Sequence, residues 1–125
     1  MNLWPVFQRY YGMPFEYGKS DCCQFVADCI EAIEPRYGDL AAPFRYGSKR
    51  EAASILRKHG GLEGLVTLIL GEPDEGVPRP GFVALVDKPR VLGIVWRNRI
   101  VARTKNDLMD LPVDRGLRFW NLWVR

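Results

Sequence analysis

The chain lacks any long hydrophobic run. Nothing in its 125 residues approaches the roughly 20 consecutive apolar residues of a membrane-spanning helix. The N-terminal segment MNLWPVFQRYYG also lacks the basic region and following apolar region of a secretory signal. We therefore expect no membrane span, synthesis and folding in a cytoplasm, and a single domain over residues 1–125.

Histidine and cysteine are scarce as well. The single histidine is His59, and the three cysteines are Cys22, Cys23 and Cys29. On a helix, Cys22 and Cys29 would stand about 10 Å apart along the axis, which is too far for a disulfide. A zinc site would need paired Cys or His from a second segment, and nothing near His59 resembles a ligand. The sequence thus predicts free thiols, with no metal and no other cofactor.

Neither sign of charge dominates. The 18 basic and 15 acidic side chains give a net charge of +3 and are interleaved along most of the sequence. The exception is the group Arg97, Arg99 and Arg103, whose odd spacing would place all three on one face of a continuous strand unless Asn98 marks a turn. A solvated strand face explains this group, and we expect no nucleic-acid partner. A small basic module that binds an acidic partner is an alternative hypothesis.

The clearest helix is predicted to begin at Cys22. Asp21 is a good N-cap, and Gln24 would complete a capping box, while Pro35 ends the helix. Apolar side chains recur at helical spacing and form one stripe, which consists of Cys22, Phe25, Val26, Cys29, Ile30 and Ile33. Cys22 therefore has a structural explanation as a small apolar residue that packs in the core.

The remaining pattern predicts helices first and strands afterwards. Helices are expected over residues 3–11, from a Ser48–Glu51 capping box to Gly60, and over residues 62–70. Runs rich in β-branched, aliphatic and aromatic residues predict strands at FVALV, VLGIVW, RIVART and LRFWNLWV. This order indicates an α+β fold, with the helices packed on a small antiparallel sheet.

Cys22 is also the candidate nucleophile, because the start of a helix carries partial positive charge that favours a thiolate. A cysteine hydrolase needs in addition a base, usually a histidine, a polar group that orients the base, and donors for the oxyanion. Asp21 stands beside the thiol and could tune it, although capping explains this residue fully.

The segment FEYGKSDCCQFVADCI resembles the nucleophile segment of the NlpC-like cell-wall peptidases, which have a papain-like fold. The matching residues are Gly18, Asp21, Cys22, Phe25 and Val26. Further on, Gly81 matches the Gly of a Gly-Asp pair, with Phe82 in place of the acid. Gly93 and Ile94 match a His-Val-Gly-Ile strand. The resemblance implies helices packed on a small antiparallel sheet or half-barrel, with Cys22 in the position of the nucleophile.

The same comparison places Val91 where the family has its catalytic histidine. The third polar residue of the family falls at Ala102, or at Arg103 if the alignment shifts by one. Valine and alanine cannot accept a proton, and the pKa of arginine is too high for a base. His59 belongs to a helical insert and is a poor substitute. The resemblance thus implies a hydrolase scaffold in which Cys22 is vestigial.

A branch of this superfamily encoded beside phage tail-tip genes resembles the chain more closely. Its members combine a Gly-x-x-Asp-Cys-Cys start, a Leu-Gly-Ile strand without the histidine, and an apolar end that contains Trp, and the chain fits this pattern along most of its length. The resemblance implies a structural component of a phage or prophage tail tip. Its partners would be other tail-tip or hub proteins, and its final location the tail of the virion.

Two further hypotheses remain open. The chain could be an active peptidase in which Cys22 attacks the stem peptides of the bacterial cell wall, with a base from an unusual group or a neighbouring subunit. Trp120 and Trp123, if they share one strand, face opposite sides, so at least one is a candidate for contact with another protein.

Overall fold

The elements follow the predicted order, with helices in the first part of the chain and strands in the second. The computed structural model describes residues 1–124. Within this range the α-helices are α1 (Trp4–Tyr10), α2 (Cys22–Ile33), α3 (Gly38–Ala41), α4 (Lys49–His59) and α5 (Gly61–Leu70). The strands are β1 (Val83–Val86), β2 (Val91–Trp96), β3 (Arg99–Arg103), β4 (Leu108–Pro112) and β5 (Gly116–Trp120). Short 3₁₀ turns occupy Pro35–Tyr37, Ala42–Phe44, Val113–Arg115 and Leu122–Val124.

The strands form one antiparallel sheet in the order β4-β3-β2-β1-β5, which confirms the predicted α+β fold. At the centre of the sheet, Gly93 of β2 stands opposite Ala84 of β1 and Ala102 of β3. A Cβ atom on Gly93 would lie 2.7 Å from the carbonyl oxygen of Val101. The close approach of β3 to β2 therefore requires glycine at this position. The predicted turn at Arg97–Asn98 joins these two strands.

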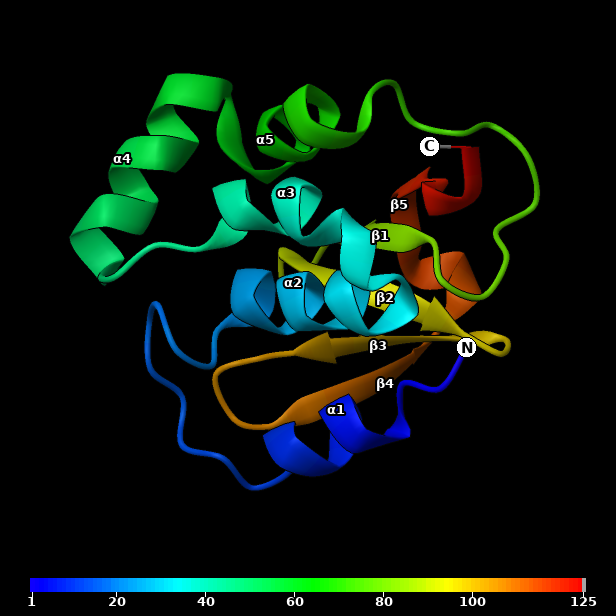
Figure 1. Cartoon of the computed structure of the whole chain (residues 1–125), viewed down its shortest axis with the longest axis horizontal. Helices are drawn as coiled ribbons and strands as arrows, with labels where there is room; N and C mark the ends of the chain where they lie inside the picture. The colour runs from blue at the N-terminus through cyan, green and yellow to red at the C-terminus, as the bar shows by residue number, and fades with distance from the viewer. Residues whose placement is uncertain (125) are drawn as a thin grey trace.

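Helix α2 lies across β2 and β3 near the middle of the molecule, while α1 lies at the lower edge and α4 and α5 at the upper edge of the view (Figure 1). The main core fills the space between the helices and the sheet. A smaller buried cluster consists of Phe82, Ala84, Val86, Val95, Ile100 and Leu111. Because Val83 and Leu85 belong to the main core and their neighbours to the smaller cluster, the two clusters lie on opposite faces of the sheet. No helix within residues 1–124 is long and apolar enough to cross a membrane.

In both predicted capping boxes the N-cap hydrogen bond forms. The second bond of the box, from the backbone N–H of the N-cap residue to the side chain three residues on, does not form. Gln24 does not turn back to its N-cap residue, because its side-chain amide donates to the carbonyl of Phe44 at 2.8 Å and ties that segment to α2. At α4, the Ser48 hydroxyl accepts from the Glu51 N–H at 3.1 Å. The Glu51 carboxylate accepts instead from the N–H of Gly47 at 3.2 Å. Each helix start is thus capped by its own Asp or Ser side chain.

The C-terminal part differs from the prediction in two ways. β4 has no counterpart among the predicted strands, because its sequence LMDLP lacks β-branched residues and alternation; it is an edge strand that pairs only with β3. The segment LRFWNLWV is not one strand. β5 ends at Trp120, and the N–H of Trp123 donates to the Asn121 side chain at 2.8 Å, which closes a turn. Trp120 is fully buried, whereas Trp123 is 46 % exposed.

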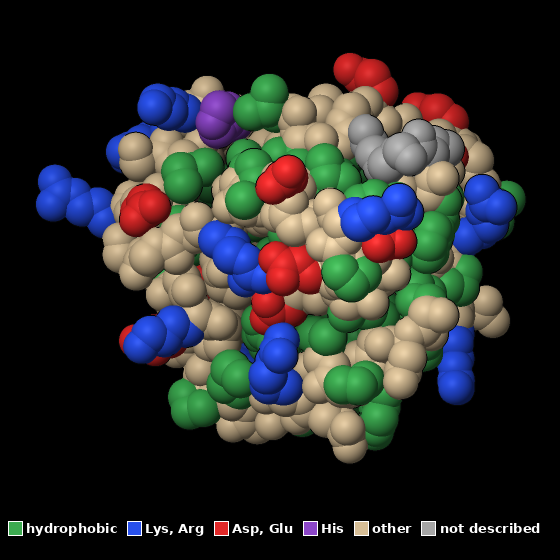
Figure 2. Space-filling model, in the orientation of Figure 1, with side chains coloured by type: hydrophobic (Ala, Val, Ile, Leu, Met, Phe, Trp, Pro, Cys, Tyr) green, Lys and Arg blue, Asp and Glu red, His purple; other side chains and the backbone are tan. Residues whose placement is uncertain are grey.

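The three arginines near β3 do not form one surface, because the alternative that Asn98 marks a turn is the one observed. Arg97 lies in the turn, and Arg99 forms an ion pair with Asp110 of β4 at 2.6 Å. Arg103 is only 1 % exposed. Figure 2 shows basic side chains interleaved with acidic ones over the face in view. The ground for a basic binding module is therefore removed.

Candidate functional site

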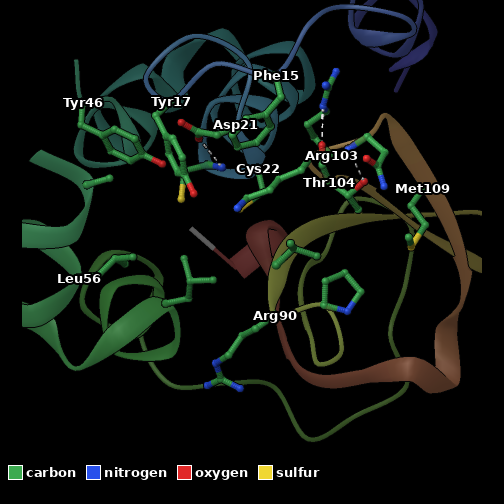
Figure 3. A pocket seen from close by; sticks show the side chains of 17 residues that line it. Phe15, Tyr17, Asp21, Cys22, Tyr46, Leu56, Arg90, Arg103, Thr104 and Met109 are labelled. Atoms are coloured by element: carbon green, nitrogen blue, oxygen red, sulfur yellow. Dashed lines mark hydrogen bonds between the residues drawn. The ribbon is translucent and has the colours of Figure 1, made fainter. Parts of the chain in front are cut away.

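A cavity of about 550 Å³ opens where the start of α2 faces the ends of β2 and β3 (Figure 3). Side chains reach it from the loop before α2, from α4 and α5, and from the β1–β2 turn. Its lining comprises Phe15, Tyr17, Asp21, Cys22, Cys23, Tyr46, Ala52, Leu56, Leu62, Pro89, Arg90, Val91, Arg103, Thr104, Lys105, Asn106 and Met109. Segments that are distant in sequence thus converge on the predicted nucleophile position.

Cys22 is the first residue of α2. It is partly buried and packs against the main core, as the helical stripe predicts, and it also lines the cavity. The pKa of its thiol is lowered. The largest cause is a hydrogen bond with the thiol of Cys23, and a backbone hydrogen bond from Leu92 adds to it. Together they outweigh burial and the negative charge of Asp21, which both raise the pKa. Cys22 therefore lies at the wall of the cavity with a pKa below that of an ordinary thiol.

Cys23 is the polar partner of this thiol, a role that the sequence did not indicate. It is 1 % exposed, and its pKa is raised by the hydrogen bond with Cys22, then by burial and by the charge of the Cys22 thiolate. When the pair loses one proton, the remaining proton therefore stays on Cys23, which donates it to the Cys22 sulfur. Cys29 lies in the core, as predicted, and burial raises its pKa.

Asp21 confirms its predicted role as the N-cap of α2. Its carboxylate accepts from the N–H groups of Cys23 and Gln24, each at 3.1 Å, and from that of Gly18 at 2.6 Å. The residue is 2 % exposed. Because three backbone donors already occupy this carboxylate, it is held in place as a structural acceptor.

Of the residues at the expected positions of the base and its orienting group, some line the cavity and others do not. Val91, the first residue of β2, lines the cavity together with Cys22. Ala102 is buried opposite Gly93 and is not part of the lining, whereas Arg103 is. His59 lies at the end of α4 and lines a separate surface hollow. Among the described residues, the cavity thus contains no imidazole.

Arg103 is the residue of this site that pattern analysis placed wrongly, as part of an exposed group. Its Nε donates to the carbonyl of Thr104 at 2.7 Å, and its Nη1 donates to those of Met13 at 2.6 Å and Tyr10 at 3.2 Å. The guanidinium lies 5.9 Å from the centre of the Phe15 ring. The one signal that could have found it was the shifted alignment, which put Arg103 at the third polar position.

The family model described as Domain of unknown function (DUF6950) matches residues 2–122. This chain belongs to that family. No curated protein and no solved structure gives a significant match to this chain. The DUF6950 match covers both α2 and β3, and therefore both the thiol and the guanidinium of the cavity. Within residues 1–124, the DUF6950 chain has no cluster of three or more His, Cys, Asp or Glu side chains that could hold a metal ion.

The loop before α2 of the DUF6950 chain offers a sharp test of how Asp21 is positioned. Gly18 has φ +84°, and a Cβ atom there would lie 2.6 Å from the carbonyl oxygen of Tyr46. Gly12 has φ +71°, but a Cβ atom there would meet nothing within 4 Å. We expect Gly12→Ala to cost about 1–2 kcal/mol of unfolding free energy from backbone strain alone. We expect Gly18→Ala to cost about 1–3 kcal/mol more, because backbone must move to relieve the clash.

Urea unfolding followed by circular dichroism measures both variants against the parent chain. Equal costs for Gly12→Ala and Gly18→Ala would show that the loop does not pack against residues 46–47 as described.

Proposed function

We propose that this protein is a non-hydrolytic structural component of a phage or prophage tail tip, built on a papain-like scaffold of the NlpC type. One observation carries the non-hydrolytic part. Cys22 stands at the head of α2, where the resemblance puts a nucleophile, yet the cavity around it holds no imidazole among the described residues. Among residues 1–124 the only carboxylate in its lining, that of Asp21, accepts from three backbone N–H groups.

The missing base matters because acyl transfer moves protons as well as the acyl group. A positioned acid or base contributes typically 10²–10⁴-fold to such a step. Cys22 can exist as a thiolate without one, since Cys23 and Leu92 stabilise the charge. The leaving amine must nevertheless be protonated, and Val91 cannot supply a proton.

The tail-tip part of the proposal rests on the resemblance of the Asp-Cys-Cys start and the Leu-Gly-Ile strand to that branch. It is supported by the presence of large apolar side chains on the surface. Trp4 is 52 % exposed, Tyr11 54 % and Trp123 46 %. Aromatic side chains of this kind are enriched where proteins contact one another. A scaffold without its reaction can still present such surfaces.

The non-hydrolytic claim is tested by incubating the purified protein with peptidoglycan and measuring the release of stem-peptide fragments by mass spectrometry. We expect no release above that of the Cys22→Ala variant. Fragments that appear with the parent chain and disappear with Cys22→Ala would overturn the claim.

The tail-tip claim needs a separate measurement. Particles of the phage or prophage that encodes the chain are purified and their proteins identified by mass spectrometry. We expect the chain in the particles at a stoichiometric level. Its absence from particles with complete tails would contradict a structural role.

An active cysteine peptidase is the second candidate, and the lowered pKa of Cys22 favours it. In that case Cys22 would attack a stem-peptide amide, form an acyl-enzyme and release an amine, with the base supplied by a partner subunit. Repeating the peptidoglycan assay with co-expressed tail-tip proteins separates the two candidates.

A further inference from the structure

Arg103 carries a buried positive charge that has no ion-pair partner among residues 1–124. Its hydrogen bonds go to backbone carbonyls. Asp107 is the acid whose pKa responds to Arg103, but its carboxylate accepts from the N–H groups of Leu108 and Gly12. The Arg103 bonds engage Nε and Nη1, and Nη2 has no acceptor among residues 1–124. A buried charge without a counter-ion is unfavourable, so this site favours an added anion.

The rest of the cavity has the same electrostatic bias. Arg90, which faces Asp87 at 4.0 Å, and Lys105 also line it. Among residues 1–124, the single carboxylate of the lining is that of Asp21, which accepts from backbone N–H groups. Figure 3 shows Arg103 and Arg90 on different sides of the hollow, with Leu56 and Tyr46 on the wall opposite Arg103. The site therefore combines an excess of positive charge with a predominantly apolar and aromatic wall.

We propose that this cavity binds a carboxylate carried on an apolar body, and that Arg103 holds the carboxylate through Nη2. A carboxylate matches a guanidinium donor and forms a charge-assisted hydrogen bond. The apolar body fits the walls formed by Phe15, Leu56 and Met109. A volume of about 550 Å³ is that of a small-molecule or peptide-end site. The inference rests on the proposed function in that the cavity binds this group rather than hydrolyses it.

Two sources could supply this chemistry: the carboxyl-terminal end of a protein chain with an apolar last residue, or a free organic acid. A peptide end would make the cavity a docking point for a neighbouring protein. A free acid would make it a small-molecule site.

The test uses Cys22 as a reporter, because a ligand in the cavity shields its sulfur. The rate of Cys22 alkylation by iodoacetamide is measured by mass spectrometry in the presence of N-acetyl-leucyl-phenylalanine or its carboxyl-terminal amide. The two probes differ only at the terminal group, which is a carboxylate in one and a neutral carboxamide in the other. We expect the acid to protect at a concentration about tenfold or more below that of the amide, as a hydrogen bond to a charged group implies.

Arg103→Gln removes the charge but keeps side-chain donors for the carbonyls, and it should abolish the preference for the acid. Arg99→Gln is the matched control, since Arg99 lies on the same strand but is exposed and paired with Asp110. It should keep the preference. Should Arg103→Gln fail to fold, the comparison of acid and amide on the parent chain decides alone.

Protection by 3-phenylpropionate as strong as that by the peptide supports a free acid, and protection by the peptide alone supports a chain end. Equal protection by acid and amide, no protection by either at millimolar concentration, or a folded Arg103→Gln variant that keeps the preference would overturn the inference. None of these results bears on the release of peptides from peptidoglycan, so failure of this inference and failure of the proposed function are distinguishable.

Discussion

Iodoacetamide is expected to alkylate Cys22 of the folded protein about a thousand times faster than Cys29, or more. Cys22 is partly exposed in the cavity and its pKa is lowered, whereas Cys29 is fully buried and its pKa is raised by burial. Only the thiolate reacts, and Cys29 reacts only when the core opens. Core opening is as rare as about one molecule in 10³ or fewer for stable small domains. Peptide mass spectrometry of quenched samples measures both rates.

The pH profile of this reaction has a defined direction. Because the pKa of Cys22 is lowered in the folded state, its alkylation should reach half of its maximal rate at lower pH than in the urea-unfolded chain. The same lowering contributes stability that is present above the unfolded pKa and is lost as pH falls through the folded pKa. Cys29 has the opposite sign: its raised pKa contributes stability below the unfolded pKa that is lost as pH rises.

The control for this prediction is Cys22→Ser, in which the fast phase should vanish, while urea should make all cysteines react alike. Equal rates for Cys22 and Cys29 in the folded protein would contradict the described exposure of the thiol. Fast alkylation by itself does not make the protein an enzyme. The thiolate is stabilised by Cys23 and Leu92, and neither of them is a base.

Phe25→Ala should lower the free energy of unfolding by about 3–5 kcal/mol, the range for a buried Phe replaced by Ala. Phe25 is fully buried in α2, and its ring contacts Tyr10 edge-on at 5.1 Å and Phe7 at 5.9 Å between ring centroids. Truncation leaves a void between α1 and α2, and both aromatic contacts are lost. Urea unfolding measures the change.

Trp4→Ala is the matched control, since Trp4 is a large aromatic residue of α1 that is 52 % exposed. It should change the free energy of unfolding by about 0.5 kcal/mol or less, as surface substitutions do. A similar cost for both variants would show that α1 is not held to α2 by the Phe25 contacts.

Local rules in the sequence determined most of the elements. Asp21 and Ser48 start helices because their side chains accept backbone N–H groups at close range. Gly60 ends α4 in the left-handed conformation, with φ 78°, because glycine adopts it without steric cost. These interactions join residues a few positions apart, so the order of residues is sufficient to predict them. The edge strand β4 was missed because its strand geometry comes from pairing with β3, not from its own residues.

The arrangement of the site, in contrast, depends on tertiary contacts as well as on local sequence. The sequence placed a thiol at a helix start and a valine where a base is expected, and both lie at one cavity. The sequence could not show that the Cys23 thiol forms a hydrogen bond with that of Cys22, because the side chains of two adjacent cysteines can take many orientations until a helix fixes them. Nor could it show that Arg103 is buried beside the site. Arg103 lies on β3, which pairs antiparallel with β2, and its guanidinium donates to the carbonyls of Tyr10 and Met13. Burial of a charge is a property of the whole folded chain, since only tertiary contacts remove the water around it.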